Sequence, residues 1–324
     1  MPTQFRALVE LDSEIDIIKF DILDGLHQSL KSIPTKLLFD HDAIRLWNQL
    51  RTSHELFPST AEMNLLDEHI EPIGNLIPEN TALVDFGCGR GEIAKKLLAH
   101  TDTIETYIPI DAASQVLMET VKDVTDHHSN LDIIPVHADF QKQFFKLPLP
   151  KEKNIVALCS STSIGMLNTT QLKEFLHQVF GRCHPKGGLL VGLELEPEEN
   201  KRDLVCEEKE GLCQKFGLHL LERMNKEFDM NFAPNKFKYK LSYNTGFKRI
   251  EMLLESLKAQ SVAILDTEIT IDVGECIKVN EVHTHKPNCF RLSCESIGFK
   301  NQLECYDSKG MTTLHYYTAS INHL

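Results

Sequence analysis

The sequence lacks a surplus of basic residues. Lys and Arg together number 34, Asp and Glu number 47, and the formal net charge is −13. Basic residues are scattered among the acids rather than gathered in a stripe. An acidic surface repels phosphate backbones, so a nucleic acid is not an expected partner. A small-molecule substrate fits this composition better.

The sequence also lacks the patterns of a secreted or membrane protein. Its nine cysteines are dispersed and none forms a C-x-x-C pair, which argues against a disulfide framework and favours reduced thiols. Glu10, Asp12, Glu14 and Asp16 interrupt the N-terminal segment, so it cannot serve as the apolar core of a signal peptide. No uncharged apolar run approaches the roughly 18 residues that span a bilayer. We expect a soluble, cytoplasmic protein that has no membrane partner.

From Thr81 to about residue 195, short apolar runs alternate with amphipathic ones, whereas residues 1–70 read as helical. Strands that alternate with helices predict βαβ units and a parallel sheet, because parallel strands need crossover connections. The expected strands cover residues 82–86, 106–110, 133–137, 154–158 and 188–194, and the expected helices cover residues 92–100, 113–125 and 170–183.

After residue 195 the pattern changes. A charged segment over 196–209 precedes an expected helix over 211–228, and strand-like runs then follow one another directly at 238–243, 249–254, 262–267 and 268–273. Neighbouring strands without helices between them predict antiparallel pairing in a second, α+β portion. The last stretch, residues 290–318, reads as a helix followed by a strand, a turn and a strand. We expect this segment to return to the first sheet.

A glycine loop follows the first strand of the alternating region. Asp85 ends that strand, and Gly87, Gly89 and Gly91 follow with G-x-G-x-G spacing. Glycines at a strand-to-helix turn let the backbone approach a ligand closely. The dinucleotide fingerprint has the different spacing G-x-G-x-x-G, so the loop favours S-adenosylmethionine (SAM), which has no pyrophosphate. A turn that binds no ligand, and an NAD site, are the alternatives that the loop alone leaves open.

Acidic residues at the next two strand ends support a nucleoside cofactor. Asp111 closes the second strand, where a carboxylate can accept both ribose hydroxyls. Asp139 and Phe140 follow the third strand, where a carboxylate could accept the adenine amino group while the ring packs on the base. The carboxyl ends of parallel strands meet at one edge of a sheet. These residues together therefore predict a SAM site.

Several segments in the same order resemble the histidine-specific SAM-dependent methyltransferases, a family that includes enzymes making hercynine on the ergothioneine pathway. The likeness covers nearly the whole chain. The matching segments are Phe39-Asp40, Glu55–Ser59, Tyr107–Asp111, Asp139-Phe140, Ser163–Leu167, Arg249–Met252 and Asn280–His283.

The resemblance implies an α/β fold with a Rossmann-like class I methyltransferase sheet, a smaller α+β substrate domain and a helical N-terminus. We expect residues 70–195 plus 287–324 to form the SAM-binding domain and residues 1–69 plus 196–286 to form the substrate domain.

The resemblance also implies a SAM-dependent N-methyltransferase that acts on a small-molecule amine. The alternative is a SAM-binding protein without catalysis, acting as a sensor or partner subunit. We expect a monomer.

The resemblance places seven residues around the acceptor: Phe39, Phe57, Met166, Cys206, Met252, Glu281 and His283. Most of them depart from the family pattern, whereas Glu281 persists and Met252 lies in a matching run. The family uses asparagine and tyrosine to hold an amino acid by hydrogen bonds, which methionine, cysteine and phenylalanine cannot do. An unpaired buried carboxylate would cost roughly 2 kcal/mol or more. We therefore expect the acceptor to be an amine on a larger or less polar molecule, or an amino-acid derivative with a masked carboxylate.

Glu281 and His283 are the candidates for catalysis, because the resemblance places them against the acceptor. An amine nucleophile must be neutral; either side chain could help to remove its proton, and Glu281 more readily orients the substrate. The alternatives are a structural carboxylate at Glu281 and a pair of strand histidines at His283 and His285. No metal is expected, since these histidines lack clustered ligands. Glu62, near Thr60, suits either capping of its own helix or an approach to the cofactor.

Overall fold

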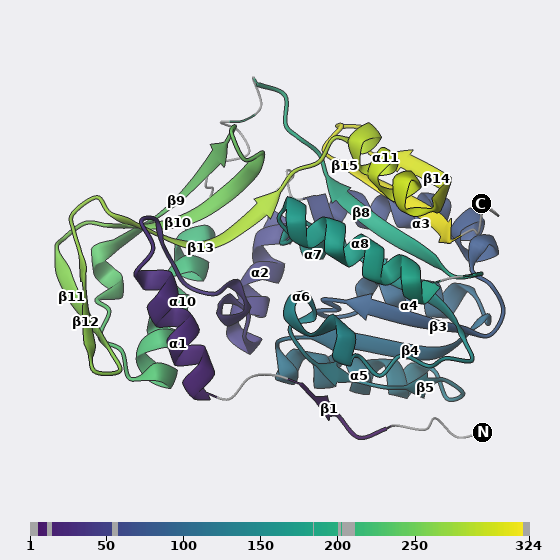
Figure 1. Cartoon of the computed structure of the whole chain (residues 1–324), viewed down its shortest axis with the longest axis horizontal. Helices are drawn as coiled ribbons and strands as arrows, with labels where there is room; N and C mark the ends of the chain where they lie inside the picture. Colours follow the sequence, from purple (N-terminus) through teal and green to yellow (C-terminus); the bar gives the residue numbers. More distant parts are fainter. Residues whose placement is uncertain are drawn as a thin grey trace. The chain divides into compact units, whose positions relative to one another are not determined.

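The computed structural model describes residues 6–11, 15–53, 58–183, 185–199, 202 and 211–319. The chain divides into two compact units, each made from separate stretches of sequence (Figure 1). Unit 1 comprises Met1–Asp12, Phe57–Glu196 and His283–Leu324, and unit 2 comprises Ser13–Leu56 and Pro197–Val282.

Unit 1 contains a nine-stranded sheet. Its strands lie in the order β1 (Val9–Glu10), β6 (Val136–His137), β4 (Ile104–Asp111), β3 (Thr81–Phe86), β7 (Asn154–Cys159), β8 (Gly188–Glu194), β15 (Thr312–Ala319) and β14 (Phe299–Tyr306), and β5 (Asp132–Ile133) also pairs with β4. The strands from β1 to β8 pair in parallel, whereas β15 is antiparallel to both of its neighbours. The predicted parallel sheet and the return of the last segment to it are therefore confirmed.

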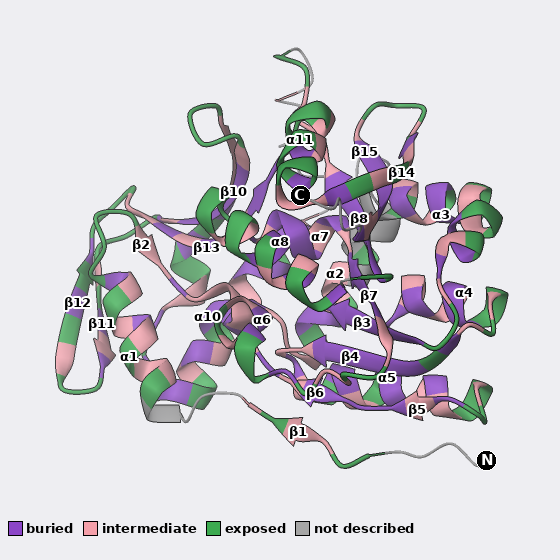
Figure 2. Ribbon diagram, turned by 45° about the vertical axis from the view of Figure 1, so that its right-hand side comes forward, coloured by how far each residue is buried: buried purple, intermediate pink, exposed green. Residues whose placement is uncertain are grey.

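Helices cover both faces of this sheet because its strands are apolar on both sides. Alternate residues of β3 enter two different clusters: Val84 packs in one and Leu83 in the other. The Val84 cluster includes α8 (Thr169–Cys183) and α11 (Pro287–Ile297); the Leu83 cluster includes α3 (Pro58–Leu76), α4 (Glu92–His100) and α5 (Ser114–His127). In Figure 2 the strands between these helices are largely buried.

Three predictions for unit 1 need correction. The expected strand over 133–137 is broken into β5 and β6, because Pro135 has no N–H to give to a strand neighbour. The N-terminal region, expected to be helical, contributes β1 to the sheet edge, where Val9 pairs with Val136. Helix α3 begins before the expected domain boundary at residue 69, yet it belongs to unit 1, where it packs against α4 and β15.

Unit 2 contains a four-stranded sheet and a separate hairpin. The sheet order is β2 (Lys31–Ser32), β13 (Cys276–His283), β10 (Arg249–Ser256) and β9 (Phe237–Asn244), and the hairpin joins β11 (Gln260–Ile264) to β12 (Thr267–Ile271). Antiparallel pairing of β9 with β10 and of β11 with β12 confirms the prediction for this region. The other elements are α1 (Ile15–Leu26), η1 (Thr35–Leu38), α2 (His41–Ser53), α10 (Leu212–Phe228) and η4 (Pro234–Lys236).

Helix α10 organises the core of unit 2. It packs against α2 and β9, and its Phe216 is fully buried. The ring of Phe216 lies 5.4 Å from Trp47 and 5.9 Å from Phe39 between ring centroids. These three aromatic side chains therefore join the N-terminal segment to α10.

Candidate functional site

The glycine loop of unit 1 is held against the end of β4. The backbone N–H groups of Gly87 and Cys88 both donate to the carbonyl of Ile110, at 2.9 and 3.0 Å. Gly87 and Gly91 have positive φ angles of 71° and 64°, which L side chains rarely adopt. A Cβ at Gly87 would lie 2.5 Å from Ser163 Oγ, and one at Gly91 would lie 2.8 Å from Thr120 Cγ2. Both positions therefore require glycine.

Gly89 differs from its two neighbours. Its φ is also positive, at 49°, but no atom lies within 4 Å of the place that a Cβ would take. Its N–H donates to Asp111 Oδ2 at 2.8 Å, and its carbonyl accepts from Thr120 Oγ1 at 2.7 Å. The backbone of Gly89 is thus fixed and borders open space, which is what close approach of a ligand needs.

Asp111 ends β4 beside Gly89. One carboxylate oxygen accepts from Gly89 N, and the other accepts from Ala113 N at 2.8 Å. A carboxylate oxygen has two acceptor sites, so Oδ1 retains one for a hydroxyl donor. The second site of Oδ2 faces the Cys88 thiol, a weak donor 4.0 Å away. Burial raises the pKa of Asp111 above its usual value. The arrangement fits the two adjacent hydroxyls of a ribose.

Asp85 lies near the end of β3, two residues before the glycine loop, and is almost fully buried. The Tyr107 hydroxyl donates to its Oδ2 at 2.9 Å. Burial, together with the nearby charge of Asp111, raises the pKa of Asp85 to about 7. Tyr107 is a partner that the sequence analysis did not identify. The strand register is the signal for it, since Asp85 pairs with Pro109, two residues from Tyr107 and on the same face of the sheet.

Asp139 and Phe140 begin the short helix α6 (Phe140–Gln143). Asp139 caps it, with Oδ1 accepting from Gln141 N at 3.1 Å. The Phe140 ring is buried against Phe86, 5.6 Å away between centroids. Its edge also borders the loop, because Cε1 lies 3.6 Å from the position of a Cβ at Gly87. The pair therefore combines a structural role with a position next to the glycine loop.

Glu62 of α3 has a role that the sequence analysis missed. Its carboxylate is buried and accepts from Ser161 N at 3.0 Å and from Ser161 Oγ at 2.7 Å. Gly192 of β8 makes room for it, since a Cβ there would lie 1.7 Å from Glu62 Oε1. Glu62 thus connects α3 to the segment that follows β7, where α7 (Ser161–Gly165) begins.

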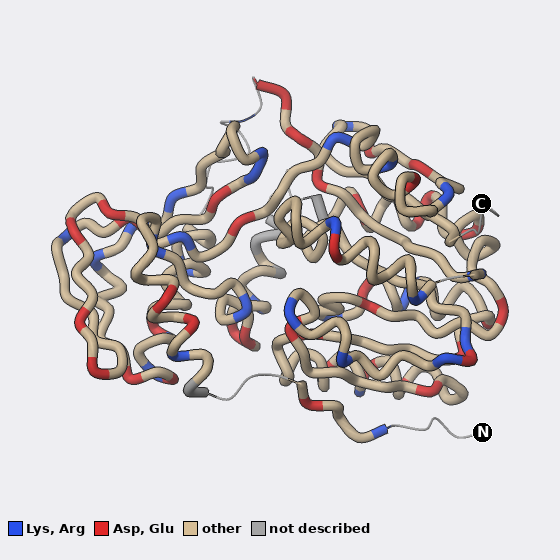
Figure 3. Tube along the Cα trace, viewed as in Figure 1, with Lys and Arg blue, Asp and Glu red and all other residues tan. Residues whose placement is uncertain are grey.

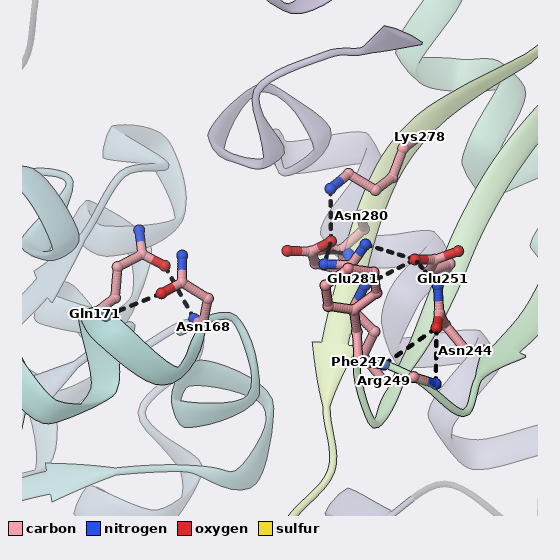
Figure 4. Close-up of polar contacts among 10 residues, drawn as sticks. Asn168, Gln171, Asn244, Phe247, Arg249, Glu251, Lys278, Asn280 and Glu281 are labelled. Atoms are coloured by element: carbon pink, nitrogen blue, oxygen red, sulfur yellow. Dashed lines mark hydrogen bonds and ion pairs between the residues drawn. The ribbon is translucent and has the colours of Figure 1, made fainter. Parts of the chain in front are cut away.

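Met166 ends α7 and is partly buried. Two residues later, Asn168 is the nearest side-chain amide, and it is used to cap α8. Its Oδ1 accepts from the backbone N–H groups of Thr170 and Gln171, both at 3.0 Å, and the Gln171 side chain accepts from Asn168 N at 3.0 Å (Figure 4). The amide oxygen of Asn168 is therefore committed to helix structure.

Glu281 of unit 2 belongs to a network of charged side chains (Figure 4). Its Oε2 lies 2.8 Å from Arg249 Nη1 and 2.6 Å from Lys278 Nζ. Arg249 also contacts Glu251 Oε1, 2.6 Å from Nη2, and Asn244 Nδ2 donates to that same oxygen at 3.0 Å. The sequence analysis did not anticipate that Glu281 is neutralised by two cations.

The other predicted acceptor residues divide between the units. Phe39 and Met252 lie in unit 2 with Glu281, whereas Met166 and His283 belong to unit 1. Met252 is buried, and its sulfur accepts from Asn280 Nδ2 at 3.6 Å. His283, the last residue of β13, is also buried. Phe57 and Cys206 lie outside the described residues.

His285 follows His283 closely in the chain. Burial, with the charge of His283, lowers the pKa of His285 to about 4.

Among the described residues, no group of three or more His, Cys, Asp and Glu side chains could hold a metal ion. None of the helices in the described part of the chain is long and apolar enough to cross a membrane.

Comparison with known proteins identifies the family. The family model described as histidine-specific, SAM-dependent methyltransferase matches residues 18–319. Histidine N-alpha-methyltransferases from Mycobacterium tuberculosis and Mycolicibacterium smegmatis are 26% and 27% identical to the chain, over 80% and 82% of it and 81% and 83% of their own lengths.

The crystal structure of a SAM-dependent methyltransferase from Clostridium acetobutylicum has the same fold. It matches 84% of this chain and 95% of its own, with a TM-score of 0.50 at 10% identity. At that identity the likeness carries the fold alone. The sheet of unit 1 with its glycine loop, and the family match over most of the sequence, lead to one conclusion. The chain belongs to the histidine-specific methyltransferase family and is a SAM-dependent N-methyltransferase.

Proposed function

We propose that Asp111 and the loop from Gly87 to Gly91 hold SAM, and that Asp139 and Phe140 contact its adenine. The observation that carries this assignment is the carboxylate of Asp111. It is fixed by two backbone amides and lies beside the open space at Gly89. Its Oδ1 retains an acceptor site, and the second donor to its Oδ2 is the weak thiol of Cys88. Asp85, two residues before Gly87, supports the loop through its hydrogen bond with Tyr107.

The acceptor side of the site is proposed to include Glu281 and His283. Bound SAM supplies an electrophilic methyl group, so the protein has mainly to align the amine and exclude water. An amine attacks only in its neutral form. We assign the His283 imidazole, a base that can accept a proton, to take the proton of the amine, while Glu281 orients the substrate. Unit 2 would then serve as the substrate domain.

For the acceptor we propose a small amine whose carboxylate is masked, or one on a less polar molecule. Met166 and Met252 offer thioethers, which accept hydrogen bonds only weakly and donate none, and the amide oxygen of Asn168 caps α8. The mycobacterial relatives are named for histidine. In this chain, Met166 and Met252 support a preference for an acceptor other than free histidine.

A binding measurement tests the cofactor site. We expect Asp111→Ala to weaken SAM binding about 30-fold or more, since two hydrogen bonds to a charged group are worth at least about 2 kcal/mol. Isothermal calorimetry measures this directly. Asp132→Ala is the matched control, because Asp132 lies on the same sheet but pairs with Arg6. Equal affinities for the two variants would refute the assignment of Asp111.

A turnover measurement tests the acceptor class. The purified protein is incubated with labelled SAM and either histidine or histidine α-amide, and S-adenosylhomocysteine is quantified. We expect the amide to be methylated faster, because its masked carboxylate needs no hydrogen-bonding anchor. Efficient methylation of free histidine would contradict the proposal.

We also propose a monomer in the cytoplasm. The eight cysteines in the described part of the chain are all free, and most are buried, which suits a reducing compartment. Size-exclusion chromatography with light scattering would test the monomer, and fractionation of the source cells would test the compartment.

A further inference from the structure

Lys278 is the most available cation of the network around Glu281. Its ammonium group has three N–H donors. One faces Glu281 at 2.6 Å, and the described residues supply no other hydrogen-bond partner for Nζ. The side chain is 24% exposed. Lys278 therefore retains donors that can meet a ligand.

Arg249, in contrast, is committed to its own carboxylate. Its Nε and Nη2 both contact Glu251 Oε1, at 2.7 and 2.6 Å, and Glu251 is buried. A buried carboxylate needs such a partner, because an unpaired charge is costly away from water. Only Nη1 of Arg249 reaches Glu281, at 2.8 Å. Glu281 thus has Arg249 on one side and Lys278 on the other.

This arrangement disfavours a third cation at Glu281. The carboxylate oxygen that would attract it already has two positive groups within 2.8 Å. An incoming ammonium or imidazolium would meet the repulsion of both, whereas an anion would meet the spare donors of Lys278. The four charged side chains sum to zero formally, so the atoms that are left without partners decide which ligand is favoured.

An apolar surface lies next to this network. The Arg249 guanidinium lies 4.7 Å from the centroid of the Phe247 ring. Phe247 is 65% exposed, at the turn between β9 and β10. The turn is fixed because Asn244 Oδ1 accepts from the N–H groups of Gly246 and Phe247. A carbon skeleton could pack on this ring while its polar end reaches Lys278.

We propose that Lys278 determines acceptor specificity, and that the methylated amine, whose α-carboxylate is masked, carries an anionic group such as a carboxylate on its side chain. This inference rests on the proposed function, in which Glu281 lies in the acceptor site. Lys278 binds the anionic group and keeps cationic and strongly N–H-donating groups away from Glu281. It is a binding residue and takes no part in the transfer of the methyl group.

Three matched amines test the preference. The α-amides of glutamate, glutamine and histidine present the same amine beside an anionic, a neutral and an N–H-donating group. With labelled SAM, we expect kcat/KM to be about tenfold higher for glutamate α-amide than for either of the others. Lys278→Met should abolish this difference, and Lys278→Arg should retain it because it keeps the charge.

Lys31→Met is the control for the loss of a lysine from the same sheet. Lys31 forms an ion pair with Glu275 at 2.8 Å, on the strand β2 that pairs with β13. It should leave the order of the three amides unchanged. Circular dichroism should confirm that each variant is folded.

Calorimetry on the protein saturated with S-adenosylhomocysteine separates this inference from the proposed function. Binding of glutamate α-amide that depends on Lys278, without turnover of any amide, would support the inference and count against the proposed acceptor class. Turnover of all three amides at similar kcat/KM would overturn the inference alone. Equal or undetectable binding of the three amides would overturn it as well.

Discussion

The carboxylates around the two halves of the candidate site are held in different ways in the two units. In unit 1, Asp85, Asp111 and Glu62 accept from a phenol, from backbone amides and from a serine. In unit 2, Glu251 and Glu281 are paired with arginine and lysine. Neutral donors orient a carboxylate without cancelling its charge, whereas cations cancel it.

The difference is visible in the pKa values. Burial without a cation raises the pKa of Asp85 to about 7. In unit 2, burial raises the pKa of Asp40, but the hydrogen bonds from His219 and Ala43 N and the charges of His219 and Arg223 together outweigh it and lower this pKa to about 2. The site carboxylates of unit 1 thus keep their charge for further hydrogen-bond donors. In unit 2 the charges of the carboxylates around Glu281 are already cancelled by cations. Figure 3 shows acids and bases interspersed along the chain in both units.

Removal of a cation from unit 2 should have the largest effect on stability. Arg249→Met leaves the buried Glu251 without its charged partner, and we expect a loss of about 3 kcal/mol in the free energy of unfolding. Urea denaturation measures it. Lys240→Met is the control, since Lys240 pairs with Glu255 across the same two strands but is exposed, and it should cost less than about 1 kcal/mol. Equal losses would show that Glu251 does not depend on Arg249.

A methyl group added beside Glu62 should have the next largest effect. In Gly192→Ala, the new Cβ would lie 1.7 Å from Glu62 Oε1, so we expect a loss of about 2 kcal/mol in stability. Shortening the acid in Gly192→Ala/Glu62→Asp should recover part of it. Gly181→Ala is the control, because nothing lies within 4 Å of its Cβ position. If both alanine variants are equally stable in urea, Glu62 does not occupy the space at Gly192.

The pair formed by Asp40 and His219 makes the stability of unit 2 depend on pH. His219 Nε2 lies 2.9 Å from Asp40 Oδ2, and its pKa is raised by that hydrogen bond above the usual 6.5. Its contribution is therefore complete below pH 6.5 and is lost as the pH rises through the folded-state pKa. The contribution of Asp40 is complete above pH 3.8 and is lost as the pH falls towards 2.

We accordingly expect His219→Gln to cost about 1–2 kcal/mol at pH 6 and less at pH 9. Urea denaturation at the two pH values checks this, and Asp40→Asn should give the same pattern. A penalty for His219→Gln that is independent of pH would mean that the charge of His219 contributes nothing.

The smallest effect is expected for the surface lysine Lys95, which follows the glycine loop. Lys95 pairs with Asp123 on α5, and both side chains are substantially exposed. Lys95→Met should change stability by less than about 1 kcal/mol and should leave SAM affinity within about threefold, a difference of under 1 kcal/mol. A tenfold loss of affinity in calorimetry would show that Lys95 leaves Asp123 to contact the cofactor.

The sequence predicts where in the fold the residues proposed for the cofactor lie, and it does so for a physical reason. Gly87, Asp111 and Asp139 lie at or within two residues of strand ends, and parallel strands bring their carboxyl ends to one edge. Local sequence therefore determines where these residues lie. The bond from Tyr107 to Asp85 depends in addition on the strand register, which the sequence alone does not give.

The acceptor side could not be predicted in this way. Lys278 and Glu281 are three residues apart on β13, a spacing that points side chains to opposite faces of a regular strand. The alternation of burial shifts by one at Val279 and Asn280, which are both buried, so the two charged residues lie on the same side. The partner Arg249 is on β10, brought there by tertiary packing. Similarly, Glu62 and Ser161 are 99 residues apart.

The position of β15 in the sheet has a consequence for biosynthesis. This strand lies between β8 and β14, and among the strands of the described residues it leaves the ribosome last. Until Thr312–Ala319 emerges, β14 has no neighbour in the sheet and β8 has an open edge. All of unit 2, which ends at Val282, is synthesised before that. Chains that terminate before residue 312 would therefore expose unpaired strands to chaperones and proteases.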